Sequence, residues 1–213
     1  MSGALQAVFQ NQRSFITLPD IGSALGGGFF AGQIDQSGTI YNLVVGPVAS
    51  AQNSSIQYKN AATATAGADS LINGPQNTAD IVADGNSTVY PAGHFCNDLV
   101  VGGFTDWYMP ALNELEVCYF NLKPTTQSNN TGTGINANAV PARASNYTTG
   151  TPAQTTATDF QSTGAEDFAA GYYWASTESS ATDAWRLGFE DGSQYGNNKS
   201  YTNRVRAIRR VAV

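Results

Sequence analysis

Arginine and tyrosine side chains are concentrated in the last third of the chain, with asparagines between them, and their types favour binding over catalysis. Between Gly192 and Val205 there is no Leu, Ile, Phe, Met or Val, yet there are two tyrosines. A solvated spacer would not need tyrosines, whereas a contact surface uses their area and hydroxyl groups. Asparagine and serine add adaptable hydrogen bonds. We therefore predict one exposed binding surface formed by Arg186, Glu190, Tyr195, Asn197, Asn198, Tyr201 and Asn203.

Residue spacings that support catalysis or metal binding are scarce. His94 is the only histidine, and no HxxxH or CxxC spacing surrounds it. Asp106 and Glu114 could form an acid pair. We instead expect Asp106 to cap a local turn and Glu114 to lie in the first turn of a helix, where the dipole favours it. The sequence predicts no catalytic residue, no metal site and no cofactor, with a structural calcium in the Asp/Asn-rich tail left open.

The tryptophans and cysteines have a structural and a functional interpretation. Trp107, Trp174 and Trp185 could stack on sugar rings, but we expect all three to be mostly buried, since each buries about 150–250 Å² in a core. Cys96 and Cys118 lie in apolar segments, which predicts buried free thiols. A bridge between them is the alternative.

The composition limits the class of protein. The chain has 213 residues, of which 41% are hydrophobic, enough for one domain with its own core. Charged residues make up only 12%, so the polar surface must consist of Asn, Ser, Thr, Gln and Gly, as suits a virion or extracellular protein. A net charge of −6 disfavours nucleic acid as a partner. The four arginines between positions 204 and 210 are expected to pair with acidic residues in a final strand.

Hydrophobic patterns predict an α+β fold of short twisted antiparallel sheets, two helices and long loops. The helices are expected over 77–84, with Asn77 as N-cap, and over 111–123, between Pro110 and Pro124. The strands are expected over 29–34, 39–45, 172–176, 184–189 and 205–211, with a polar loop over 125–165.

The N-terminal segment is treated separately. Residues 1–25 are predicted to be an attachment or assembly arm, with a first strand of the domain as the alternative, and residues 26–213 to be one domain. The chain shows neither a membrane-spanning run nor a signal-peptide pattern. We therefore expect it to be made in the host cytoplasm and to reach the outside by lysis or on a particle.

Three ordered motifs resemble the Lcl C-terminal (DUF1566) family. They are GGFTDWYMPALNEL at 102–115, YWASTES at 173–179, and a closing pattern of Trp185, Phe189, Gly192, Lys199 and VRAIRR at 205–210. The resemblance implies a C-type-lectin-like fold. The calcium-dependent sugar motifs of lectins, Glu-Pro-Asn or Gln-Pro-Asp followed by Trp-Asn-Asp, do not occur here.

The N-terminal ALQAVFQNQRSF resembles the start of proteins encoded among phage tail genes. Phage receptor-binding proteins with the lectin-like fold present ligand contacts between the Trp-x-x-x-Phe element and the final Val-Arg strand. The resemblance thus implies a non-enzymatic receptor-binding module at a phage tail or fibre tip, a homotrimer that binds a host glycan or protein. The alternatives are a structural virion protein (capsid decoration or collar) and, with least support, an enzyme of the sulfatase-modifying type.

Overall fold

The computed structural model describes residues 18–213. Most of the predicted attachment arm, residues 1–17, lies outside the described residues. The remainder of that segment packs on the domain, because the amide of Gly22 donates to the carbonyl of Phe30 at 2.8 Å and Ala24–Leu25 pairs with the following strand.

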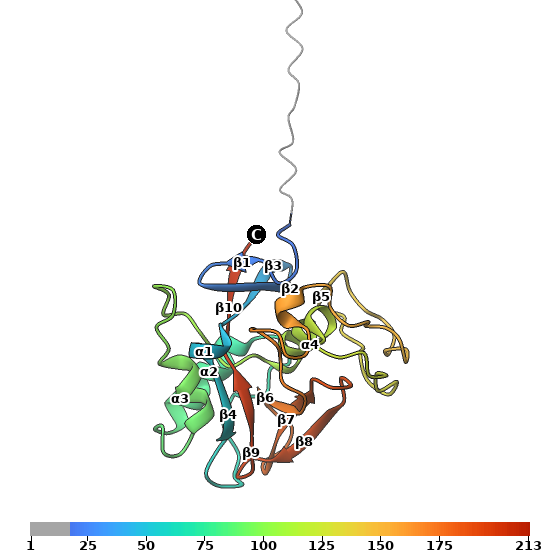
Figure 1. The fold of residues 1–213 in the computed structure, drawn as a ribbon. Coiled ribbons are helices and arrows are strands. Elements are labelled where there is room, and N and C mark those ends of the chain that lie inside the picture. Colours follow the sequence, from blue (N-terminus) through green and yellow to red (C-terminus); the bar gives the residue numbers. More distant parts are fainter. Residues whose placement is uncertain (1–17) are drawn as a thin grey trace, which may run out of the picture.

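Two curled sheets and four helices form an α+β fold, as predicted (Figure 1). The first sheet has the order β1-β2-β3-β10, with β5 paired to β2; the second has the order β4-β9-β6-β7-β8. The first sheet consists of β1 (Ala24–Leu25), β2 (Gly28–Gln36), β3 (Thr39–Val45), β5 (Ala139–Val140) and β10 (Ile208–Ala212). The second consists of β4 (Gln52–Gln57), β6 (Tyr172–Glu178), β7 (Asp183–Gly188), β8 (Gln194–Asn198) and β9 (Thr202–Arg206).

The β2–β3 hairpin confirms the first two predicted strands. Gln36 pairs with Thr39, which leaves a two-residue turn of Ser37 and Gly38. Both turn residues have positive φ, at 54° and 90°, as a turn that follows the sheet twist requires. The carboxylate of Asp35 accepts the amide of Gly38 at 2.7 Å and fixes the turn.

Two of the four helices were predicted. They are α2 (Gly74–Asp84) and α4 (Leu112–Leu122); α1 (Val48–Ala51), α3 (Pro91–Asn97) and a 3-10 turn (Thr158–Phe160) were not. The prediction of Asn77 as N-cap is wrong, because a proline near the N-terminus starts α2 earlier and Asn73 caps it. Asn77 is buried inside the helix, where its amide donates to the carbonyl of Ser70 at 2.7 Å.

The predicted last strand is two strands in different sheets. The chain leaves β9 at Arg206, and Ala207 bonds to Ala51 and Gly46 instead of continuing the ladder. It then enters β10, which pairs with β3. The C-terminus therefore lies beside the first described strands at one end of the molecule, and the β8–β9 turn lies at the other end (Figure 1).

Three of the four C-terminal arginines pair with acids, as expected, and the longest pair joins Arg210 to Glu114 at 4.0 Å. Arg206 contacts Glu166 at 2.7 Å, and Arg209 contacts Asp106 at 2.7 Å. This ion pair corrects the expectation for Asp106, which joins β10 to the 102–107 loop instead of capping a turn. The Arg209 guanidinium lowers the pKa of the Asp106 carboxyl.

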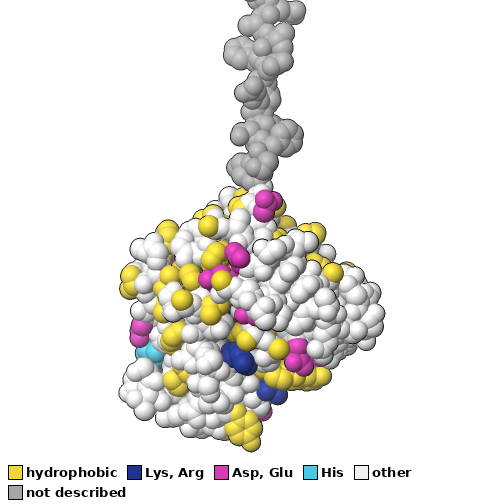
Figure 2. All heavy atoms as spheres, in the orientation of Figure 1, with side chains coloured by type: hydrophobic (Ala, Val, Ile, Leu, Met, Phe, Trp, Pro, Cys, Tyr) yellow, Lys and Arg dark blue, Asp and Glu magenta, His cyan; other side chains and the backbone are white. Residues whose placement is uncertain are grey.

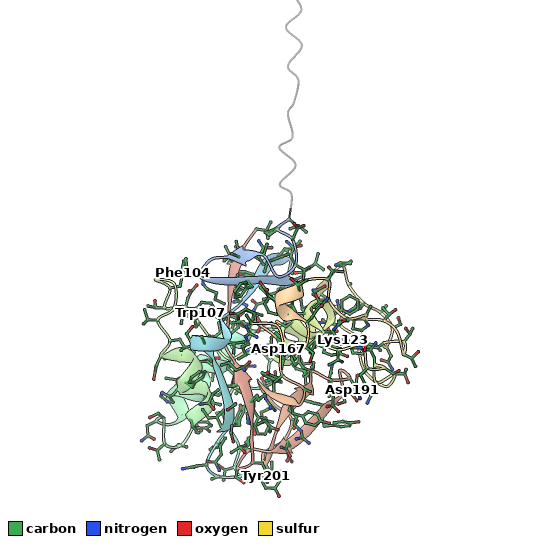
Figure 3. The ribbon with its side chains drawn as sticks, in the orientation of Figure 1. Phe104, Trp107, Lys123, Asp167, Asp191 and Tyr201 are labelled. Carbon is green, nitrogen blue, oxygen red and sulfur yellow. The ribbon has the colours of Figure 1, made fainter. Side chains whose placement is uncertain are left out.

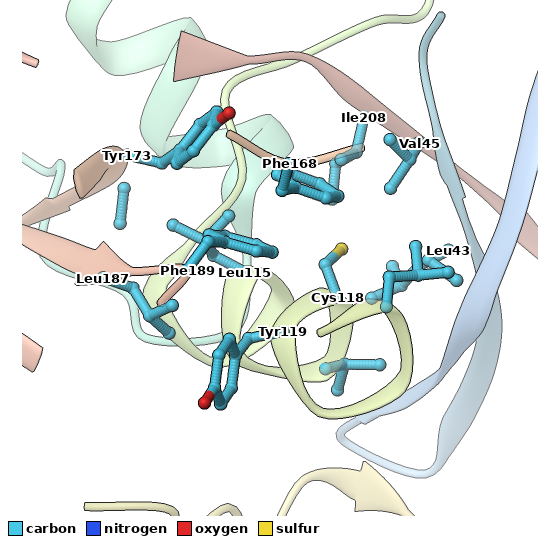
Figure 4. Packing of buried hydrophobic residues seen from close by; sticks show 14 of the residues in the cluster. Leu43, Val45, Leu115, Cys118, Tyr119, Phe168, Tyr173, Leu187, Phe189 and Ile208 are labelled. Carbon is cyan, nitrogen blue, oxygen red and sulfur yellow. The ribbon is translucent and has the colours of Figure 1, made fainter. Parts of the chain in front are cut away.

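The core has two parts, one on each side of the second sheet. Leu115, Cys118 and Tyr119 of α4 point into the first part, against the stacked rings of Phe168 and Phe189 (Figure 4). The second part lies beneath α2 and α3 and contains Trp107, Trp174 and Cys96. Both cysteines are buried free thiols, as predicted.

The tryptophans divide into two groups. Trp107 and Trp174 are fully buried, and Trp185 packs against the core from a partly buried position, so all three agree with the prediction of mostly buried side chains. None of the helices between residues 18 and 213 is long and apolar enough to span a membrane.

Candidate ligand-binding site

Strands β6 to β9 position the predicted binding residues. Arg186 on β7 lies opposite Trp174 on β6 and opposite Tyr195 on β8. Residues directly opposite one another point to the same face of a sheet, and every second residue along a strand shares that face. Tyr173 on β6 pairs with Arg204 on β9, so Asn203 shares the face of Tyr172. Tyr172, Arg186, Tyr195, Asn197 and Asn203 therefore lie on one face, with Trp174 filling the core beside them.

Three of the seven predicted residues meet in a tight group. The Arg186 guanidinium lies 3.9 Å from the centre of the Tyr172 ring, and its Nη1 donates to Oδ1 of Asn203 at 3.2 Å. The rings of Tyr172 and Tyr195 meet edge to face, with centroids 6.5 Å apart. We call Tyr172, Arg186, Tyr195 and Asn203 the Arg186 cluster.

The Arg186 cluster contains two buried hydrogen-bond donors without acceptors. Nε of Arg186 and Nδ2 of Asn203 are buried and have no partner among the described residues. Within residues 18–213, Arg186 also has no carboxylate at ion-pair distance. Buried polar groups are almost always paired, and an unpaired donor costs about 1–3 kcal/mol. Both atoms are covered, so a ligand that moves the neighbouring side chains aside and brings acceptor oxygens to these donors would recover that free energy.

Of the other four predicted residues, one lies on β8 beside Tyr195 and the other three lie at the ends of β8 and in the connections that follow or precede it. Asn197 shares the strand and face of Tyr195. Asn198 shapes the β8–β9 turn, because its Oδ1 accepts the amide of Ser200 at 3.0 Å. Tyr201 is 62% exposed at the end of that turn (Figure 3). Glu190 is exposed in the β7–β8 connection, away from Tyr201, so the prediction of one continuous surface holds for only part of the set.

Two contributors were missing from the prediction. Tyr172 was assigned to a strand with no binding role, yet its ring supports the Arg186 guanidinium. Asn130, from the long polar loop, donates to the Tyr195 hydroxyl at 3.3 Å. The alternation of β6 around Trp174 places Tyr172 on the face of Arg186, but only the strand register identifies it. Nothing in the sequence indicates the contact of Asn130.

The surface chemistry is mainly neutral and polar. Figure 2 shows a face dominated by uncharged polar and backbone atoms, with a few basic atoms over the β6–β9 region. In the described part of the chain, no group of three or more His, Cys, Asp or Glu side chains is placed to hold a metal ion. The arrangement is suited to hydrogen-bonding and aromatic contact with a ligand.

Comparisons with known proteins place the chain in a family. No curated protein matches it. The profile of the Lcl C-terminal domain matches residues 53–209, which include the whole Arg186 cluster and all of the second sheet except Gln52, the first residue of β4. The match covers most of the chain and agrees with the three motifs at 102–115, 173–179 and 185–210. The chain therefore belongs to the Lcl C-terminal domain family.

Proposed function

We propose that this protein is a non-enzymatic adhesion module of a phage tail or fibre tip, which binds a glycan or protein on the host cell through the Arg186 cluster and Tyr201. The observation that carries the proposal is the pair of unsatisfied buried donors, Arg186 Nε and Asn203 Nδ2, next to an exposed tyrosine. Unpaired buried donors are costly, and acceptor atoms of a ligand would satisfy them. Membership of the family is compatible with a surface module.

The arrangement of the two ends supports this role. Strands β1 and β10 lie at one end of the molecule, and Tyr201 lies at the other (Figures 1 and 3). Attachment to a particle through residues 1–25 would leave the β8–β9 turn pointing outward. We further propose a C-type-lectin-like fold, in keeping with the pairing of the last strand beside the first ones.

The test is adsorption of particles that carry Tyr195→Ala together with Tyr201→Ala. Both rings are largely exposed, at 49% and 62%, so the free energy of unfolding should change by no more than about 1 kcal/mol. We expect assembled particles that adsorb poorly to the host. Normal adsorption with failed assembly would support the alternative, a structural virion protein that buries this surface against a neighbouring subunit.

Oligomerisation is a separate part of the proposal. We propose a homotrimer assembled through the N-terminal segment, which also joins other virion proteins. Sedimentation of the full chain and of a protein lacking residues 1–17 tests this, since the second retains β1. An oligomer that survives the truncation would exclude that role for residues 1–17.

A further inference from the structure

A groove lies on the other face of the β7–β8 hairpin from the Arg186 cluster. Trp185 precedes Arg186 on β7 and therefore points to the opposite side of the sheet. The groove has a volume of about 360 Å³, within the range of small-molecule sites. Its lining consists of Gly132, Thr133, Gly134, Ile135, Asn146, Trp185 and Gln194.

Trp185 gives this groove an aromatic wall with a free donor. The indole N–H groups of the two buried tryptophans are satisfied: Trp107 donates to the carbonyl of Val101 at 3.3 Å and Trp174 to that of Ile56 at 2.9 Å. The Trp185 indole has no acceptor in the part of the chain that the structure describes. A partly exposed tryptophan with an unpaired N–H offers both a stacking surface and a hydrogen bond.

The rest of the lining is polar but uncharged. The side-chain amides of Asn146 and Gln194 make no hydrogen bond to residues 18–213, so both keep donors and an acceptor for a ligand. Ile135 is 58% exposed and adds an apolar contact. No lining residue is ionisable. The groove therefore matches a ligand with an apolar face and several hydroxyl groups, and offers no charge for an ionic one.

Buried bonds hold the groove in shape before any ligand arrives. The far wall belongs to the 125–165 loop, which α4 anchors through the buried carboxylate of Glu116. That carboxylate accepts the amide of Asn136 at 2.6 Å and the hydroxyl of Tyr147 at 2.5 Å, and pairs with Arg143. On the strand side, Thr133 donates to the carbonyl of Gly192 at 2.9 Å. A preformed wall lowers the ordering cost of binding.

From this geometry we propose that the Trp185 groove is a metal-independent binding site for a single uncharged pyranose ring of a glycan. One face of the sugar packs on the indole, and its hydroxyl groups bond to the Trp185 N–H and to the amides of Asn146 and Gln194. The site is separate from the Arg186 cluster and does not depend on its function.

The indole N–H signals in NMR spectra of the full-length protein test the proposal. The probes are the methyl glycosides of glucose, galactose, mannose and N-acetylglucosamine, each up to about 50 mM, a range that covers dissociation constants in the millimolar range. We expect at least one glycoside to shift the Trp185 signal saturably, while the signals of Trp107 and Trp174 stay in place. Trp185→Phe assigns the signal.

Matched variants separate binding in the groove from a general solvent effect. The double variant Asn146→Ala with Gln194→Ala should raise the dissociation constant read from the Trp185 signal about tenfold. The control is Asn60→Ala, which removes an exposed amide outside the groove and should leave the dissociation constant unchanged. The proposal is overturned if no glycoside shifts the signal, if the double variant binds as well as the wild type, or if glucuronic acid binds more tightly than glucose. Particle adsorption can fail or succeed independently of these results.

Discussion

Arg186 on β7 reaches across β6 and donates to Asn203 on β9 at 3.2 Å. The guanidinium crosses the intervening strand by lying on the ring of Tyr172, 3.9 Å from its centre. This single side chain thus joins three strands of the second sheet while its Nε remains unpaired. The contact is weak for an arginine, which usually binds a carboxylate in a two-pronged arrangement. The position of Arg186 is therefore fixed by these contacts, although its hydrogen-bonding capacity is only partly used.

Replacing Arg186 should affect adsorption more than stability. Arg186→Ala removes one cation–π contact and one hydrogen bond but also the buried unpaired Nε, so the net loss of unfolding free energy should be only about 1 kcal/mol. A lost charged hydrogen bond to a ligand weakens binding by about ten- to a hundredfold. Adsorption of variant particles and denaturant unfolding measure the two effects. Arg204→Ala is the control, because Arg204 follows Asn203 on β9 and points to the other side. Equal losses for both variants would refute a specific role of Arg186.

Asn203→Asp tests whether Arg186 must keep an unpaired donor in order to bind a ligand. The new carboxylate would pair with the guanidinium and supply the acceptor that Nε lacks. We expect the protein to unfold at the same or a slightly higher denaturant concentration, and its particles to adsorb less well. Improved adsorption would show that the ligand is a cation or a donor, not an acceptor.

The two tryptophans on adjacent strands should differ in their contribution to stability. Trp174 is fully buried, so Trp174→Ala should lower the free energy of unfolding by about 3–5 kcal/mol. Trp185 has one side open to the groove, and Trp185→Ala should lower it by about 1–3 kcal/mol. Denaturant midpoints at constant m-value provide the comparison. A loss for Trp185→Ala as large as that for Trp174→Ala would mean that the indole is structural only.

The sequence predicted the parts of the fold that carry their own local signals. The β2–β3 hairpin has a turn-forming cluster that ends in Gly38, a residue suited to positive φ, and α4 has an apolar stripe between two prolines. Strand β8 lacks such a signal, since the Gln-Tyr-Gly-Asn-Asn segment has low strand propensity and is extended only because β7 offers a ladder. The break at Ala207 likewise depends on partners elsewhere in the chain.

The candidate site was predictable in composition but not in arrangement. The tyrosines between Gly192 and Val205 indicated a contact surface, and Tyr195 and Tyr201 are exposed. Strand register then decides which residues share a face, and register cannot be read from a polar segment without apolar alternation. For this reason Asn198 was expected in the surface and shapes a turn, while Tyr172 was overlooked.

The ion pair of Asp106 and Arg209 should contribute little at neutral pH and nothing in acid. The lowered pKa of Asp106 means that the folded state favours the carboxylate. The stabilisation is present above the unfolded pKa of about 3.9 and is lost as the pH falls through the lower folded value. Because the Asp106 side chain is 55% exposed, Asp106→Asn should cost no more than about 1 kcal/mol. Thermal unfolding should show a small difference in stability between Asp106→Asn and the wild type at pH 7, and no difference in acid.

Glu114 should give the opposite pH dependence. Burial raises the pKa of its carboxyl from 4.5 to about 7, although the amides of Ala111 and Gly74 and the Tyr108 hydroxyl donate to it. The folded state therefore binds a proton more tightly than the unfolded state. Its contribution to stability is complete below about pH 4.5 and is lost as the pH rises through 7, on the order of 3 kcal/mol in all.

Glu114→Gln should remove most of that slope, because glutamine stays neutral and can accept the two amides while donating to Tyr108. Urea unfolding from pH 5 to 8 measures it: we expect the variant to match the wild type near pH 5 and to exceed it at pH 8. Burial also raises the pKa of Glu116, so the stability of the Glu114→Gln variant should still fall with rising pH, though less steeply. Glu116→Gln measures the part of the pH dependence that Glu116 causes. Parallel pH profiles of the Glu114→Gln variant and the wild type would show that Glu114 stays ionised in the folded protein, held by its three donors.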